Sequence, residues 1–119
     1  MSNLSAPDEA FRVSVEHRGE IAIVRLSGSA NMDNSGSLQD RLYEAADLPI
    51  KCLVLDLSQL DFMSSVGLGA IMAAHLRCQH RNCQIKLVGP QPRIVELLDL
   101  AQITRLFKVF KTLDEALAV

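Results

Sequence analysis

Two short, almost unbroken apolar runs constrain the fold of this chain more strongly than any other feature of its sequence. They are Ile21–Leu26 and Cys52–Leu57, and Arg25 and Asp56 are their only charged residues. Near-continuous apolar runs of this length are typical of interior strands that are covered on much of both faces. The sequence therefore predicts a sheet whose central strands are buried.

The residues before these runs follow a different pattern, which predicts a half-exposed strand. Phe11, Val13 and Val15 alternate with polar residues, and alternation with a period of two indicates a strand with one face in water. Gly19 then provides a turn, so this strand and Ile21–Leu26 are expected to form a hairpin. One alternating strand beside two continuous ones indicates a mixed sheet.

Segments with helical periodicity separate the later strands. Helices are expected at 33–48, 66–81, 92–101 and 113–117, and further short strands at 84–88 and 107–110. Strands that are joined through helices normally pair in parallel by right-handed crossovers. The order predicts a single α/β domain over residues 11–119, with a four- or five-stranded mixed sheet and about four helices. Residues 1–10 are polar and are predicted to form a flexible tail.

Composition excludes several classes of function. The chain has 12 basic and 14 acidic residues, a formal net charge of −2, and only 4% aromatic residues. A nucleic-acid-binding domain would carry clustered basic side chains or aromatic platforms for bases. No apolar run reaches the ~18 residues of a membrane span, and no signal peptide is visible. Three cysteines, an odd number, favour reduced thiols. We expect a cytoplasmic domain without membrane insertion or direct nucleic-acid binding.

The stretch from Leu57 to Gly69 is the most informative part of the chain for function. It leads from an interior strand through two serines, Ser64 and Ser65, into a helix rich in small residues. Backbone N–H groups and the positive end of a helix dipole favour an anion at such a junction. Either serine could act as a helix N-cap or accept a phosphate, and Gly67 and Gly69 could allow close packing.

Catalytic and metal sites are not supported by the sequence. It contains no P-loop, and the residues around Ser65 lack the first glycine of a hydrolase nucleophile elbow. The spacing of His75, Cys78, His80 and Cys83 spreads these side chains around more than half of a helix. Four ligands in that arrangement cannot converge on one tetrahedral ion. We therefore expect no enzyme activity, no cofactor and no metal.

Several segments together resemble the STAS domain of bacterial anti-sigma factor antagonists. The matching segments are Leu26–Gly28, Leu53–Ser58, Leu60–Gly69, Ile85–Gly89, Val95–Leu100, Leu106–Phe110 and Asp114–Leu117. The block Phe62-Met-Ser-Ser-Val-Gly-Leu68 is the most specific of them. The resemblance implies the STAS fold, with the helices mainly on one face of the sheet.

The resemblance also implies a non-enzymatic switch in a signalling pathway. Such proteins bind an anti-sigma factor, often one with serine-kinase activity, and thereby regulate transcription that depends on the sigma factor. The kinase phosphorylates a residue in the strand-to-helix loop, and a phosphatase reverses this. Alignment on Gly67 places Ser65 at the acceptor position, with Ser64 as second choice. The partner-binding residues are then Asn31, Ser64, Ser65, Val66 and Gly67. Asn31 and Ser64 follow parallel strands and are expected at the same end of the sheet.

The chain departs from the family pattern at two places. Gly28-Ser-Ala-Asn31 stands where many members have Gly-Glu-Leu-Asp, so two acidic positions are lost. In the family this loop is linked to partner contacts and to nucleotide affinity, so the resemblance implies at most weak binding of a nucleotide or small ligand by this chain. Val66 is bulkier than the residue usual before Gly67. The alternative function is a stand-alone ligand-sensing or scaffold module, as in transporter tails, lipid-transport assemblies and stress-signalling complexes.

Overall fold

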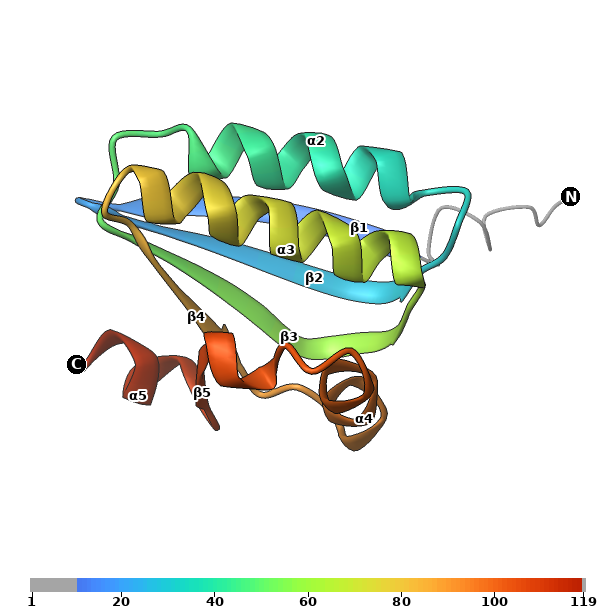
Figure 1. The fold of residues 1–119 in the computed structure, drawn as a ribbon. Helices are drawn as coiled ribbons and strands as arrows, with labels where there is room; N and C mark the ends of the chain where they lie inside the picture. Colours follow the sequence, from blue (N-terminus) through green and yellow to red (C-terminus); the bar gives the residue numbers. More distant parts are fainter. Residues whose placement is uncertain (1–10, 119) are drawn as a thin grey trace, which may run out of the picture.

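The computed structural model describes residues 11–118 of the 119-residue chain, so the predicted tail at 1–10 lies outside the described residues. These residues form a five-stranded sheet in which the spatial order of the strands follows the chain (Figure 1). The elements are β1 (Phe11–Arg18), β2 (Ile21–Ala30), α2 (Ser35–Ala46), β3 (Cys52–Met63), α3 (Ser65–His80), β4 (Gln84–Val88), α4 (Pro92–Leu100), the 3-10 turn η1 (Thr104–Leu106), β5 (Lys108–Phe110) and α5 (Leu113–Leu117).

The sheet is mixed, as the sequence predicts. β1 pairs antiparallel with β2, whereas β2, β3, β4 and β5 are parallel neighbours. Gly19 lies in the β1–β2 turn with a φ of 60°, a conformation that glycine adopts without the steric cost of a Cβ atom. Helices connect the parallel strands. One long helix joins β2 to β3 and another joins β3 to β4, whereas α4 and η1 together join β4 to β5.

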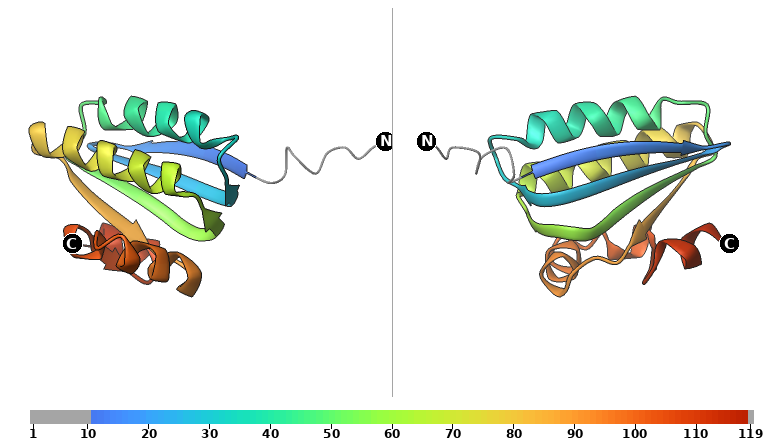
Figure 2. Two further views of the ribbon diagram at one scale, coloured as in Figure 1. Left: turned by 45° about the vertical axis from the view of Figure 1, so that its right-hand side comes forward. Right: turned by 180° about the vertical axis from the view of Figure 1, so that it is seen from behind.

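The two faces of the sheet are covered unequally. Buried side chains of α2, α3 and α4 share one large cluster with inward-facing residues of β2 and β3, such as Val24 and Leu55. The opposite face carries a small cluster in which Ile23 and Val54 pack near Ala116 of α5. Seen from behind, β1 and β2 lie in front of α3 (Figure 2). The prediction of helices mainly on one face is confirmed.

The strands β2 and β3 are longer than the sequence predicts. The expected ends were Leu26 and Leu57, whereas the strands continue to Ala30 and Met63. The parallel pairing shifts register twice, so that the 12 residues of β3 accompany the 10 residues of β2. Each shift places an extra residue in β3 and breaks the regular alternation of apolar side chains. The segment expected to be a loop therefore contains the end of a strand.

The helix α3 is close to its predicted position. It begins one residue earlier and ends one residue earlier than the expected range of 66–81. Cys78 is buried on its core-facing side, whereas His75 is half-buried and its ring packs edge-on against that of Phe107, with centroids 5.1 Å apart. Within the described residues, no helix combines the length and apolar character that a membrane span requires.

Candidate functional site

The ends of β2 and β3 bring the two predicted functional loops together. Ala30 lies opposite Met63 in the parallel ladder, and the Ser64 N–H donates to the Ala30 carbonyl over 2.8 Å. Asn31 follows the first of these residues directly, so it lies at the same end of the sheet as Ser64. The expectation that both loops share one end of the sheet is confirmed.

Ser64 is the N-cap of α3. Its extended backbone precedes the first helical turn, and its Oγ accepts a hydrogen bond from the Gly67 N–H at 3.2 Å. Only 7% of the residue is exposed. The hydroxyl therefore satisfies one of the N–H groups that the start of a helix leaves without an intrahelical partner.

Ser65 has a different environment from its neighbour. It is the first residue of α3 and is exposed to solvent. It lies where the unpaired N–H groups and the positive end of the helix dipole favour negative charge. The structure thus gives the two adjacent serines separate positions: Ser64 is buried in the cap, and Ser65 lies on the surface.

Gly67 allows the first turn of α3 to approach the end of β3. A Cβ atom at this position would lie 2.7 Å from Cγ of Met63 and 3.6 Å from Cδ2 of Leu38 in α2. Gly69, only two residues later, has nothing within 4 Å of the corresponding point. The two glycines look equivalent in sequence, but only Gly67 is required by close packing.

The Asn31 side chain holds the loop between β2 and α2. Its Oδ1 accepts hydrogen bonds from the backbone N–H groups of Asp33 (2.9 Å) and Asn34 (3.1 Å). The Asn34 side-chain amide donates in turn to the Ser29 carbonyl at 2.9 Å. This hydrogen bonding fixes the path of the chain as it leaves β2 and gives the surface next to Ser64 a defined shape.

Two exposed apolar residues at this end of the sheet were not expected from the sequence. Met32, in the Asn31 loop, is 64% exposed, and Phe62, at the end of β3, is 37% exposed. Val66, which was expected in the site, is 39% exposed. We call Met32, Phe62 and Val66 the apolar rim. Phe62 was missed because β3 was expected to end at Leu57, and nothing in the sequence distinguishes Met32.

Exposed methionine and aromatic residues are characteristic of the centres of protein–protein interfaces. The rim lies on segments that adjoin the surface serine: the Asn31 loop, the end of β3 and the first turn of α3. Elsewhere, residues 11–118 contain no group of three or more His, Cys, Asp or Glu side chains placed to hold a metal ion. This end of the sheet presents the exposed Ser65 beside the exposed side chains of the apolar rim.

Comparisons with known proteins agree with this arrangement. RsfB, an anti-sigma-F factor antagonist of Mycobacterium tuberculosis, is 30% identical over 115 residues, which cover 96% of this chain and 92% of the relative. An anti-sigma factor antagonist from Mycobacterium paratuberculosis has a similar crystal structure, with a TM-score of 0.82, 24% identity, and coverage of 92% of this chain and 93% of that chain.

The Bacillus protein SpoIIAA in its phosphorylated form shares the fold at a TM-score of 0.72 and 17% identity, over 92% of this chain and 97% of that chain. A family model described as the STAS domain matches residues 12–116, nearly the whole chain. The match agrees with the strand order of the sheet, with the helices mainly on one face and with the serines at the start of α3. The chain belongs to the STAS domain family.

Proposed function

We propose that this protein is an anti-sigma factor antagonist, which binds an anti-sigma factor through the surface around Ser65 and so regulates sigma-factor-dependent transcription. The observation that carries the proposal is the position of Ser65, exposed at the start of α3 and adjoined by the apolar rim. The similarity to RsfB, which is named an anti-sigma-F factor antagonist, supports it. In this proposal the protein acts in the cytoplasm as a binding module, without catalysis, cofactor or metal.

The partner surface consists of polar and apolar parts with different roles. Burial of Met32, Phe62 and Val66 against a partner supplies the hydrophobic contribution, at roughly 25 cal/mol for each Å² of apolar surface removed from water. Asn31, Ser64 and Gly67 fix the shape of the surface from within. Ser65 is the position at which the affinity of this surface is regulated.

Phosphorylation of Ser65 by a partner with serine-kinase activity is the proposed switch, and a phosphatase reverses it. A phosphoserine adds nearly two negative charges, which the start of α3 favours while the surface is open to water. Docking would remove that dianion from water, at a cost of several kcal/mol unless the partner supplies a cation. A loss of ~3 kcal/mol lowers affinity more than a hundredfold.

Ser65 is preferred to Ser64 as the acceptor because of burial and hydrogen bonding. Ser64 is only 7% exposed, and its hydroxyl caps α3 by accepting from the Gly67 N–H. A kinase would therefore have to open the first turn of α3 to reach it. Ser65 requires no such opening. The shared fold of phosphorylated SpoIIAA is in keeping with a phosphate that changes the surface without unfolding the domain.

The test is phosphorylation and binding of four single variants with the serine-kinase anti-sigma factors encoded in the same genome. Ser65→Ala should lose label from radiolabelled ATP and bind the kinase constitutively, whereas Ser64→Ala should keep the label. Ser37→Ala is the matched control, because Ser37 is an exposed serine in the first turn of the neighbouring helix α2. Ser65→Asp should bind more weakly than the wild-type chain.

Label that persists on Ser65→Ala and disappears from Ser64→Ala would contradict the assignment of the acceptor. Binding that is equal for wild type, Ser65→Asp and the phosphorylated chain would contradict the switch. Loss of the apolar rim gives an independent measure of the docking surface. Phe62→Ala should weaken binding. Because only 37% of Phe62 is exposed, the variant should also lose some stability, and urea unfolding measures that loss separately from binding.

A further inference from the structure

A hollow of about 290 Å³ lies on the sheet face opposite α2 and α3, away from the serine loop. Leu26 contributes to its lining, and its polar residues are Arg12, Ser14, Arg25, Ser27, Asp56 and Gln59. These residues come from β1, β2 and β3, in the part of the sheet that α5 does not cover. A hollow of this size approaches the lower end of the range for small-molecule sites.

The register of the sheet explains how these side chains come together. Two rows run across three adjacent strands: Arg12–Ser27–Gln59 and Ser14–Arg25–Asp56. Side chains opposite one another in such rows lie about 5 Å apart, and those on the diagonal remain within reach of long side chains. The short Ser14 and Ser27 occupy one diagonal of the β1–β2 pair, whereas Arg12 and Arg25 occupy the other. The hollow therefore forms above the serines, between the arginines.

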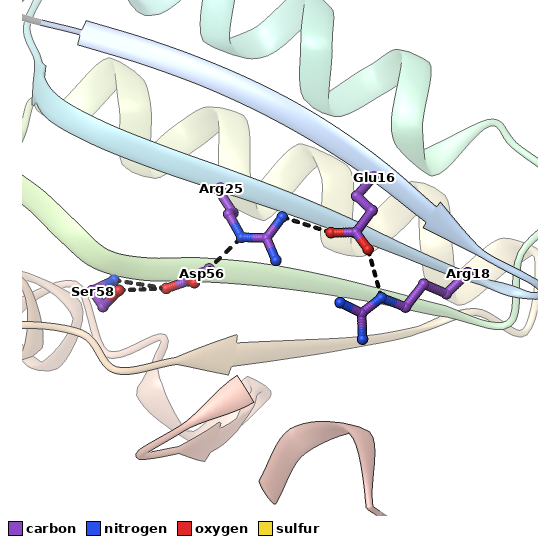
Figure 3. Close-up of polar contacts among 5 residues, drawn as sticks. All are labelled: Glu16, Arg18, Arg25, Asp56 and Ser58. Atoms are coloured by element: carbon purple, nitrogen blue, oxygen red, sulfur yellow. Dashed lines mark hydrogen bonds and ion pairs between the residues drawn. The ribbon is translucent and has the colours of Figure 1, made fainter. Parts of the chain in front are cut away.

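Arg25 is held in place by acidic groups on both neighbouring strands (Figure 3). Its Nη1 donates to Oε1 of Glu16 at 2.8 Å, and its Nε lies 4.0 Å from Oδ2 of Asp56. Asp56 is fixed in turn by the N–H (3.0 Å) and hydroxyl (2.7 Å) of Ser58, and Glu16 also pairs with Arg18 at 2.6 Å. Hydrogen bonds from Arg18 and then Arg25 hold the pKa of the Glu16 carboxyl below its ordinary value, so Glu16 is ionised at neutral pH.

The charge around the hollow is not balanced. Its lining contains two guanidinium groups, on Arg12 and Arg25, and one carboxylate, on Asp56. Asp56 and Arg25 offset one another, but Arg12 has no ion pair or side-chain hydrogen bond with any residue from 11 to 118. The excess positive charge and the fork of donors on Arg12 fit an oxyanion such as a carboxylate or a phosphate.

The remaining groups of the hollow fit hydroxyl groups better than a bare ion. The Ser14 and Ser27 hydroxyls and the Gln59 amide both donate and accept, and a carboxylate oxygen of Asp56 still has acceptor capacity. A ligand that only accepts hydrogen bonds could not form a hydrogen bond with the Asp56 carboxylate, which has no proton to donate. A ligand that carries its own hydroxyl groups can donate to it.

We propose that this hollow binds a small hydroxylated oxyanion, a phosphate monoester or carboxylate of a short polyol, whose anionic group pairs with Arg12 and whose hydroxyl groups contact Asp56 and Gln59. The site lies on the face of the sheet opposite α2 and α3, in the part that α5 does not cover, so the inference does not rest on the proposed function at Ser65. It would give the protein a second input, from a metabolite, besides phosphorylation.

The probes are sn-glycerol 3-phosphate and D-glycerate, titrated into the isotope-labelled full chain and followed by its amide NMR spectrum. Inorganic phosphate and glycerol, the two halves of the first probe, are titrated in parallel. Saturable shifts centred on Arg12, Ser14, Arg25 and Ser27 are expected with one or both hydroxylated anions. The probe that binds more tightly shows whether the site prefers a phosphate or a carboxylate. Inorganic phosphate and glycerol should each bind more weakly than that probe.

Two variants with one control separate recognition from folding. Arg12→Gln removes the guanidinium charge and should weaken binding about tenfold or more, the effect of ~1.4 kcal/mol. Ser14→Met fills the hollow without changing charge, and it should abolish the shifts. Arg93→Gln makes the same charge change as Arg12→Gln at an exposed position of α4 and should bind like wild type. Thermal unfolding confirms that each variant is folded.

Three outcomes would overturn the proposal. The first is the absence of saturable shifts on β1, β2 and β3 with both hydroxylated anions. The second is equal weakening by Arg12→Gln and Arg93→Gln, which would indicate a general charge effect. The third is binding of inorganic phosphate as tight as that of sn-glycerol 3-phosphate, which would exclude a role for the hydroxyl groups.

Discussion

The backbone of Gly67 lies so close to the Met63 side chain that a Cβ atom at residue 67 would be 2.7 Å from the Met63 Cγ. Met63 is the last residue of β3 and is almost fully buried, with 1% exposure. The contact therefore joins the end of the central strand to the first turn of α3. It determines how Ser65, between the two residues, is presented at the surface.

Gly67→Ala should destabilise the fold by roughly 1–3 kcal/mol, because the new methyl group can be accommodated only by moving a buried side chain. Gly69→Ala is the matched control in the same helix, where the added Cβ meets nothing within 4 Å. That substitution should stabilise the protein by up to about 1 kcal/mol, the helix-propensity difference between glycine and alanine. Urea unfolding of both variants measures the contrast, and stability changes of the same sign would contradict it.

The two serines should also respond differently to truncation. Ser64→Ala removes the N-cap hydroxyl that accepts from the Gly67 N–H and should cost about 1 kcal/mol of stability. Ser65→Ala removes an exposed hydroxyl and should change stability by less than about 0.5 kcal/mol. The difference is measurable by urea unfolding in the absence of any partner. A larger loss in Ser65→Ala would show that its hydroxyl, and not that of Ser64, supports the helix.

The arrangement of the sheet could be predicted because each strand carries a strong local signal. The alternation from Phe11 and the nearly continuous run from Cys52 distinguish a half-exposed strand from a buried one. The ends of the strands could not be predicted. The register shifts between β2 and β3 interrupt the alternation after Leu57, so Phe62 was assigned to a loop. A bulge depends on the partner strand, and a single strand's sequence does not reveal it.

The candidate site was predictable in part for a similar reason. The order of parallel strands places Asn31 near Ser64, and a serine before a helix is a recognisable cap. Which of the two adjacent serines caps α3 depends on how the chain bends after Met63. That bend is visible only in the structure and not in the sequence. The hollow on the open sheet face was missed because Arg12, Arg25 and Asp56 are far apart in sequence and meet only through the register.

Lys86 should be important for the attachment of α5. It is only 4% exposed, its Nζ donates to the Ala116 carbonyl at 2.7 Å, and it lies 5.4 Å from the centre of the Phe110 ring. Lys86→Met keeps an apolar chain of similar length but leaves the carbonyl of α5 without this donor. We expect a loss of about 1–3 kcal/mol and faster amide hydrogen exchange in α5.

Lys111→Met is the control for that prediction, because Lys111 is exposed and precedes the same helix. It should leave both stability and the exchange of α5 nearly unchanged. Equal exchange rates in α5 for Lys86→Met and wild type would contradict the proposed attachment. An equal effect of both variants would instead indicate a general dependence on positive charge near the C-terminal helix.

Cys78 should make stability sensitive to alkaline pH. Burial, and then hydrogen bonding with Cys83, raises the pKa of the Cys78 thiol from its ordinary value of 9.0 to about 12. The unfolded chain therefore releases this proton at lower pH than the folded chain does. The stabilising effect is complete below about pH 9 and is lost as pH rises toward 12, with a slope that approaches about 1.4 kcal/mol per pH unit from this one group.

The measurement is the free energy of unfolding in urea at about pH 8 and about pH 10, under reducing conditions, for wild type and Cys78→Ala. Wild type should lose more stability between these two values than Cys78→Ala, because the variant has no thiol at this position to ionise on unfolding. Leu98→Ala, a core truncation without an ionisable group, should be less stable than wild type at both values but should keep the wild-type pH dependence. If Cys78→Ala and wild type lose the same stability, ionisation of the Cys78 thiol is not the cause.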